Sequence, residues 1–127
     1  MSILFDKLKP IIDKNIYECN KNIYILNSDN DKEITDLILA TYSTAKISNP
    51  NDDFDKACLI LMWLNNTKKS QIIKFINEYL DKKKIIILIV PMDFDFNYIY
   101  NHTIANSLDM INWKNNNKIY FIMLKKY

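Results

Sequence analysis

The fold class follows from one stretch, ACLILMWLNNTKKSQIIKFINEYLDKKKIIILIV, residues 57–90. It begins with a continuous apolar run at 57–64 and ends with another at 85–90, and both runs predict strands that are buried on both faces. Between them, apolar residues recur at helical spacing over 65–83, behind a polar start that suits a helix cap. Buried strands alternating with helices indicate a mainly parallel sheet built with right-handed crossovers.

The same alternation continues on both sides of this stretch, so we expect a single α/β domain over residues 1–127. We expect a three-layer, doubly wound fold of the flavodoxin-like or Rossmann-like kind, with a mainly parallel sheet of about four to five strands. The remaining predicted elements are a helix at 2–16 that is broken or kinked at Pro10, a strand at 22–26, a helix at 31–45, a loop at 48–55, a short helix at 105–113 and a last strand at 118–124.

The composition argues against nucleotide chemistry. The chain has no Gly, and every one of its 17 basic residues is Lys. Loops that cradle phosphate use Gly because the backbone must approach the ligand closely or adopt positive φ. Nucleotide-dependent catalysis is therefore improbable for this chain. The excess of Ile, Asn, Lys and Tyr is typical of strongly AT-rich coding, as in organelle genomes, some viruses and reduced bacteria.

Cysteine and histidine are too sparse to suggest a metal or redox site. Cys19 and Cys58 lie far apart in the sequence, and His102 is the one histidine. We expect two unpaired thiols in a reducing compartment, with Cys58 in a strand. No apolar run reaches the roughly 18 residues that a membrane-spanning helix needs, so we expect no membrane partner.

Three loops follow predicted strands and should meet at one edge of the sheet, where ligands of such folds usually bind. They are the segments 27–31, 64–69 and 91–98.

One interpretation of this edge is a receiver domain, in which Asp29 and Asp31 would hold a metal ion. A receiver also needs an aspartate at the end of the central strand. This chain has Trp63-Leu64-Asn65 there, which makes a working phosphoacceptor improbable.

Another interpretation is a flavin site, in which Tyr98, Tyr100 and Trp113 would stack on the flavin ring and Ser28 would contact its phosphate. The carboxylates just after Ser28 would repel that phosphate, and no Gly-rich turn is present to hold it. Packing therefore explains these aromatic side chains better.

The order of elements as a whole resembles the bacterial-type ribosomal protein S-two family of the small subunit. KLKPIIDKNIYECNKNIYILNSDNDKEITDLILA is similar to the family's helix, GGxILFVGTK strand and helix, with 22–27 at the strand. The segment 56–111 follows the family's PDLLIVLDP strand, helix, IPVIALVDTNxDP strand and PIPxND turn. Val90-Pro91-Met92-Asp93 falls on the VDTN stretch, and 102–106 falls on the PIPxN stretch, which opens a helix in the family.

This sequence departs from the family in several places. The two family glycines are replaced by Asn20 and Lys21, and the long coiled-coil insertion is reduced to 48–55. The N-terminal arm is absent, and KIYFIML near the end has no counterpart.

The resemblance implies a structural constituent of the small ribosomal subunit that works in translation, inside a mitochondrion. It implies no catalysis, no cofactor and no small-molecule substrate. Its partners would be small-subunit rRNA and neighbouring ribosomal proteins, with lysines contacting phosphate and asparagines contacting sugar and phosphate. The candidate rRNA contacts are Lys68, Lys69, Lys82, Lys83, Lys84, Asn115, Asn116, Lys118, Lys125 and Lys126.

The alternative is a non-catalytic flavodoxin-like or receiver-like interaction module of a virus or a reduced genome, located in the cytoplasm. For any single lysine, a solvated surface explains the charge as well as an RNA contact does.

Overall fold

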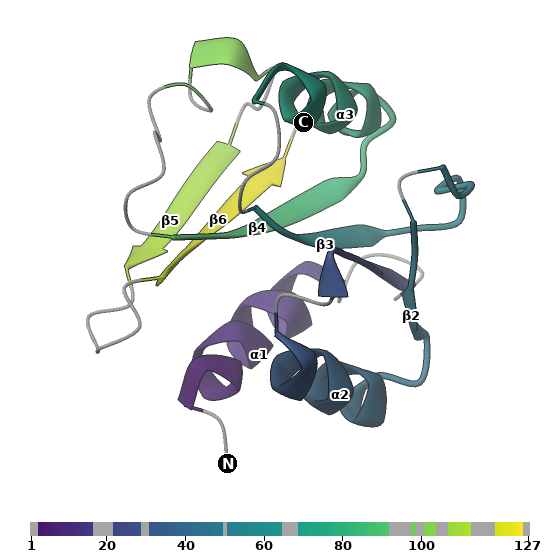
Figure 1. Ribbon diagram of the computed structural model, residues 1–127, viewed down its shortest axis with the longest axis vertical. Helices are drawn as coiled ribbons and strands as arrows, with labels where there is room; N and C mark the ends of the chain where they lie inside the picture. The colour runs from purple at the N-terminus through teal and green to yellow at the C-terminus, as the bar shows by residue number, and fades with distance from the viewer. Residues whose placement is uncertain are drawn as a thin grey trace. The chain divides into compact units, whose positions relative to one another are not determined.

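The computed structural model describes residues 3–16, 22–28, 31–49, 51–64, 69–91, 98, 101–103, 107–112 and 119–125. The chain divides into two compact units, Met1–Met62 and Trp63–Tyr127, which are described one at a time (Figure 1).

The first unit combines two helices with three short parallel strands. The strands lie in the order β2-β1-β3, and β1 is paired in parallel with both of its neighbours. The elements are α1 (Ile3–Ile16), β1 (Ile23–Leu26), α2 (Lys32–Thr41), β2 (Ala45–Ile47) and β3 (Leu59–Trp63).

The core of this unit forms because its two central strands are apolar throughout. Every residue of β1 and β3 is buried, as expected for a parallel sheet covered on both faces. Helix α1 contributes Leu8 and Ile12, and α2 contributes Ile34 and Ile38, all at helical spacing and all almost fully buried.

The loop before β3 is held by an aromatic anchor. Phe54 is only 1% exposed, and its ring packs against Tyr24 of β1 with the centroids 5.4 Å apart. The Nζ atom of Lys46, on the edge strand β2, lies 4.4 Å from the centre of the same Tyr24 ring. The loop at 48–55, predicted from its polar, Pro- and Asp-rich composition, thus covers part of the sheet.

The second unit contains α3 (Lys69–Asp81), β4 (Ile85–Pro91), β5 (Ser107–Asn112) and β6 (Ile119–Lys125). The strands lie in the order β4-β6-β5, and both pairings are antiparallel. Helix α3 packs against β4, as Figure 1 also shows. Just before α3, the backbone N–H of Leu64 donates to the carbonyl of Ile89 in β4 over 2.9 Å.

The predicted α/β class is confirmed. Strands and helices interleave from α1 to β4, and the sheet is open, mixed and consistent with a three-layer fold. The predicted strands at 22–26, 57–64, 85–90 and 118–124 all occur, shifted by no more than two residues at either end.

Two strands were not predicted. The prediction of a short helix at 105–113 is wrong, because residues 107–112 form β5 instead. Leu108 and Met110 stand opposite Leu124 and Ile122 of β6, so cross-strand pairing favours an alternating pattern over the helical one. The helix expected at 31–45 ends at Thr41, and its last predicted residue begins the edge strand β2.

Pro10 does not break the first helix. Helix α1 runs without interruption from Ile3 to Ile16 and contains Pro10 within it. Proline removes one backbone hydrogen bond from the helix interior, and the buried apolar face of α1 compensates for that loss.

Candidate nucleic-acid interface

Charge is distributed unequally between the two units. Met1–Met62 contains seven Lys and ten acidic residues, whereas Trp63–Tyr127 contains ten Lys and five acidic residues. The small net charge of +2 for the whole chain therefore conceals an acidic unit and a basic one. A local excess of cations is the electrostatic feature that polyanion-binding surfaces share.

The best described group of cations in the basic unit is the end of α3. The N–H of Lys83 donates to the carbonyl of Leu80, and the N–H of Lys84 donates to that of Tyr79, both over 3.0 Å. Lys83 has φ 64°, which is the left-handed conformation. These bonds and this φ define a Schellman motif, in which Lys83 takes the position that glycine usually occupies. The turn places three successive lysines at the C-terminus of the helix.

Each of these lysines has a different environment. Lys82 has its Nζ 3.9 Å from the carboxylate of Glu78 and 5.3 Å from the ring centre of Tyr79. Lys83 is exposed, and Lys84 is half-buried. Cations are also favoured by the dipole at a helix C-terminus, so part of the role of this cluster is structural. Among the three, Lys83 is the side chain best placed to meet a phosphate.

The other predicted rRNA contacts are not placed by the structure. Lys69 begins α3 and Lys125 ends β6, but their side chains are not among those described. The remaining five lie outside the described residues: Lys68, Asn115, Asn116, Lys118 and Lys126.

A second feature of the basic unit joins α3 to the segment at 101–103. The rings of Tyr98 and His102 are stacked, with centroids 4.3 Å apart and an interplanar angle of 23°. The Nδ1 atom of His102 lies 2.9 Å from the carbonyl oxygen of Tyr98. Because that oxygen can only accept, Nδ1 carries the proton and donates it. The side-chain amide of Asn77 in α3 donates to the carbonyl of His102 over 3.0 Å.

In the sequence, these two aromatic residues carry separate signals. Tyr98 fits the flavin interpretation, whereas His102 is the one histidine and belongs to the PIPxN-like stretch. Their spacing of four residues, which brings side chains together on a helical turn, was the available signal for the stack. The other two aromatic residues of the flavin interpretation, Tyr100 and Trp113, lie outside the described residues.

The carboxyl end of β1 is occupied by a helix cap. A carboxylate oxygen of Asp31 accepts the N–H of Ile34 over 3.0 Å and caps the N-terminus of α2. The carbonyl of Ser28 accepts from the N–H of Asp31 and from the hydroxyl of Thr35. Asp29 lies outside the described residues, and within the described ones no group of three or more His, Cys, Asp or Glu side chains is arranged to hold a metal.

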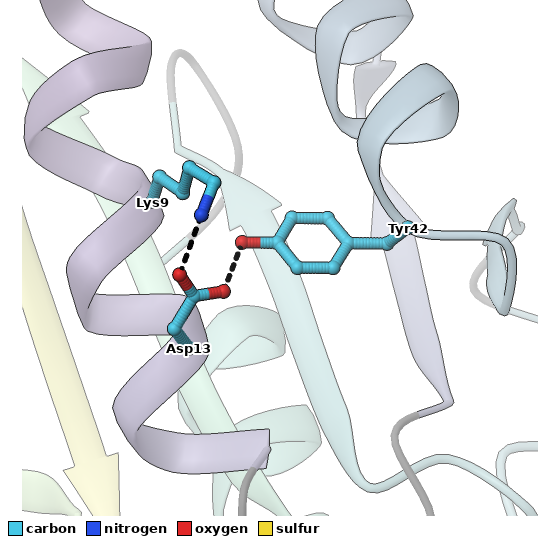
Figure 2. A network of polar contacts seen from close by, with 3 residues as sticks. All are labelled: Lys9, Asp13 and Tyr42. Atoms are coloured by element: carbon cyan, nitrogen blue, oxygen red, sulfur yellow. Dashed lines mark hydrogen bonds and ion pairs between the residues drawn. The ribbon is translucent and has the colours of Figure 1, made fainter.

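In the first unit, one polar network joins α1 to the end of α2 (Figure 2). The carboxylate of Asp13 accepts the hydroxyl of Tyr42 over 2.6 Å and the ammonium of Lys9 over 2.7 Å. Partial burial raises the pKa of Tyr42 well above its ordinary range, and the Asp13 carboxylate raises it further.

The pKa of Asp13 moves in the opposite direction. Burial raises the pKa of Asp13, but the hydrogen bonds from Lys9 and Tyr42 and the charge of Lys9 outweigh it, so the pKa lies below 3.8. Asp13 therefore bonds to Lys9 along α1 and to Tyr42 at the C-cap of α2, which indicates a role in helix packing.

The expectation of two unpaired thiols is wrong, because Cys58 is disulfide-bonded. Cys58 lies just before β3, where its N–H and that of Leu59 both donate to the carbonyl of Asn22, just before β1. The amide side chain of Asn22 donates in turn to the carbonyl of Lys56 over 3.0 Å. The starts of the two parallel strands are therefore neighbours. Cys19, the other cysteine of the chain, precedes Asn22 by three positions and lies outside the described residues.

Within the described part of the chain, no helix is both long and apolar enough to cross a membrane. No known family model matches this chain, and no curated protein matches it.

Proposed function

We propose that this chain is a non-catalytic docking protein of the small ribosomal subunit, of the mitochondrial kind. It binds rRNA through its basic second unit and contacts neighbouring ribosomal proteins elsewhere. The observation that carries this proposal is the segregation of charge, with ten Lys against five acidic residues in Trp63–Tyr127. Lysines concentrated in one unit provide the phosphate contacts that make RNA binding favourable and dependent on salt.

The order of elements supports the resemblance on which the proposal is based. Strand, helix, strand, helix and strand follow one another in β1, α2, β3, α3 and β4, after allowance for the additional edge strand β2. The support ends after β4, because residues 107–112 are a strand where the family has a helix.

The first test follows the native chain in its own source. We expect it to co-sediment with the small ribosomal subunit in a sucrose gradient at moderate salt, detected by mass spectrometry of the fractions. Migration as a small unbound protein at every salt concentration would contradict the proposal.

The second test asks which unit binds RNA. We expect the pair Lys82→Gln and Lys83→Gln to lower the slope of log affinity against log salt by about 1 to 2. The matched control is Lys7→Gln with Lys32→Gln, which removes two exposed cations from the acidic unit. Equal effects of the two pairs would mean that binding does not depend on the end of α3.

A second candidate is a non-catalytic flavodoxin-like or receiver-like interaction module. Two observations favour it over a ribosomal protein. The antiparallel β4-β6-β5 arrangement includes a strand that the family pattern lacks. Cys58 is disulfide-bonded, which is uncommon in reducing compartments and so favours a module that works outside both the mitochondrial matrix and the cytoplasm. This candidate predicts a small, soluble protein that sediments separately from ribosomes.

A further inference from the structure

We infer that the stacked pair of Tyr98 and His102 is a platform for an unpaired RNA base, with Lys74 contacting the adjoining phosphate. This inference rests on the proposed function and names the part of the RNA that the second unit recognises. Sequence-tolerant binding of single strands commonly combines an aromatic stacking surface with nearby cations.

The platform is preorganised by three contacts. The ring of His102 is stacked on that of Tyr98, and the Nδ1–H bond to the Tyr98 carbonyl sets its orientation. Asn77 holds the backbone of His102 against α3. A surface that is already ordered loses little conformational entropy when a base stacks on it, which favours binding.

The position of the platform suits a ligand in solution. His102 is exposed, whereas Tyr98 is only half-buried beneath it. One face of the imidazole ring is covered by the tyrosine, and a base can approach from the other face. Stacking on histidine and tyrosine tolerates any base, because every base has a π face.

The charges next to Asn77 orient the strand. Lys74 is exposed and precedes Asn77 by three positions on α3, so the two lie on the same face of the helix. Asp81 is also exposed and follows Asn77 by four positions, so Lys74 and Asp81 lie in opposite directions from Asn77 along the helix axis. A phosphate next to the stacked base is therefore attracted toward Lys74 and repelled from Asp81 and from the exposed carboxylate of Glu78, which both lie C-terminal to Asn77. This polarity distinguishes the platform from the lysine cluster at the end of the helix.

The test uses the full chain and two labelled RNA strands of equal length and charge, one of adenosines and one without bases. Fluorescence anisotropy should show tighter binding of the adenosine strand by the unaltered protein. His102→Ala should weaken binding of that strand by roughly 5- to 100-fold and leave the strand without bases unaffected. His102→Phe should restore the preference, because phenylalanine also stacks. Circular dichroism confirms that each variant is folded.

Lys74→Gln tests the phosphate contact separately. It should reduce the salt dependence of binding to both strands by a similar amount and leave the preference for bases intact. Asp81→Asn should strengthen binding of both strands.

The results separate this inference from the proposed function. Salt-dependent binding of both strands that His102→Ala leaves unchanged would overturn the platform and leave the ribosomal proposal standing. Failure of the unaltered chain to bind either strand would overturn both.

Discussion

At the scale of single residues, the absence of glycine determines which side chains take the left-handed backbone positions. Among the described residues, positive φ occurs at Asn27 and Lys83. Asparagine tolerates this conformation, but it destabilises lysine, because the Cβ atom comes too close to the backbone. The sequence predicted a helix as far as residue 83, and the structure ends it at Asp81 with a Schellman motif. Without a glycine to mark the end of the helix, the boundary could not be predicted.

This position gives a stability prediction. Lys83→Gly should raise the free energy of unfolding by about 0.5–1 kcal/mol, because relief of the left-handed strain exceeds the entropy cost of a new glycine. Urea unfolding of the variant and the unaltered protein measures this change in the free energy of unfolding. Lys83→Ala is the matched control, since it removes the same charge and retains the Cβ atom. The explanation fails if glycine is no more stabilising than alanine.

At the scale of elements, pairing and packing with neighbouring elements decide what periodicity leaves ambiguous. Residues 107–112 fit both a helix and a strand, and the pairing of β5 with β6 selects the strand. Helix α1 contains Pro10 but stays continuous, because its apolar face is buried. The sequence predicted these elements from local spacing, which carries no information about the partner against which each one packs.

The contact between α1 and α2 predicts a dependence of stability on pH. Tyr42 has a raised pKa in the folded state. Its contribution to the free energy of unfolding is therefore complete below pH 10.0 and is lost as the pH rises from there toward the folded-state pKa. Asp13 has a lowered pKa, so its contribution is complete above pH 3.8 and is lost as the pH falls through the folded-state value.

Tyr42→Phe removes the hydrogen bond and should lower the free energy of unfolding by about 1 kcal/mol near neutral pH. Thermal or urea unfolding across the pH range should show that this difference in free energy between the variant and the unaltered chain becomes smaller at low pH and at high pH. Lys9→Gln is the comparison variant: it removes only an exposed ion pair, and its effect should stay below about 0.5 kcal/mol and decrease with salt. A constant difference between Tyr42→Phe and the unaltered chain at all pH values would exclude the Asp13 hydrogen bond as its cause.

At the scale of the whole molecule, parallel neighbours bring together residues that are distant in the sequence. Strands β1 and β3 are adjacent although α2 and β2 lie between them in the chain. Asn22 and Cys58 therefore meet where the two strands begin, which is also where Cys58 is disulfide-bonded. The spacing of the cysteines predicted two separate thiols, because adjacency of the strands is not visible in the sequence.

The disulfide predicts a measurable effect of reduction. Cys58→Ser should lower the free energy of unfolding by about 2–5 kcal/mol, since the open chain gains entropy when it unfolds. Treatment of the unaltered protein with a dithiol reductant should have the same effect, and the same treatment should not affect the variant. Thiol labelling of the unreduced, denatured chain provides the direct check. Two reactive thiols per chain in that experiment would show that the disulfide is not formed.

The sequence by itself determined the α/β class, the four principal strands and the three long helices. Continuous apolar runs and helical spacing are local properties, and they report whether a segment must be buried. It also predicted lysines as the groups that would bind RNA, although half of the ten candidate contacts lie outside the described residues.

Only the tertiary structure decided which segments become neighbours. It revealed the strands β2 and β5, the disulfide at Cys58 and the Tyr98–His102 stack held by Asn77. Each of these depends on a contact between residues that are distant in the sequence, which for the stack is the bond from Asn77 to His102. The physical reason is that hydrogen bonding and burial across elements outweigh the weaker preferences that each segment has by itself.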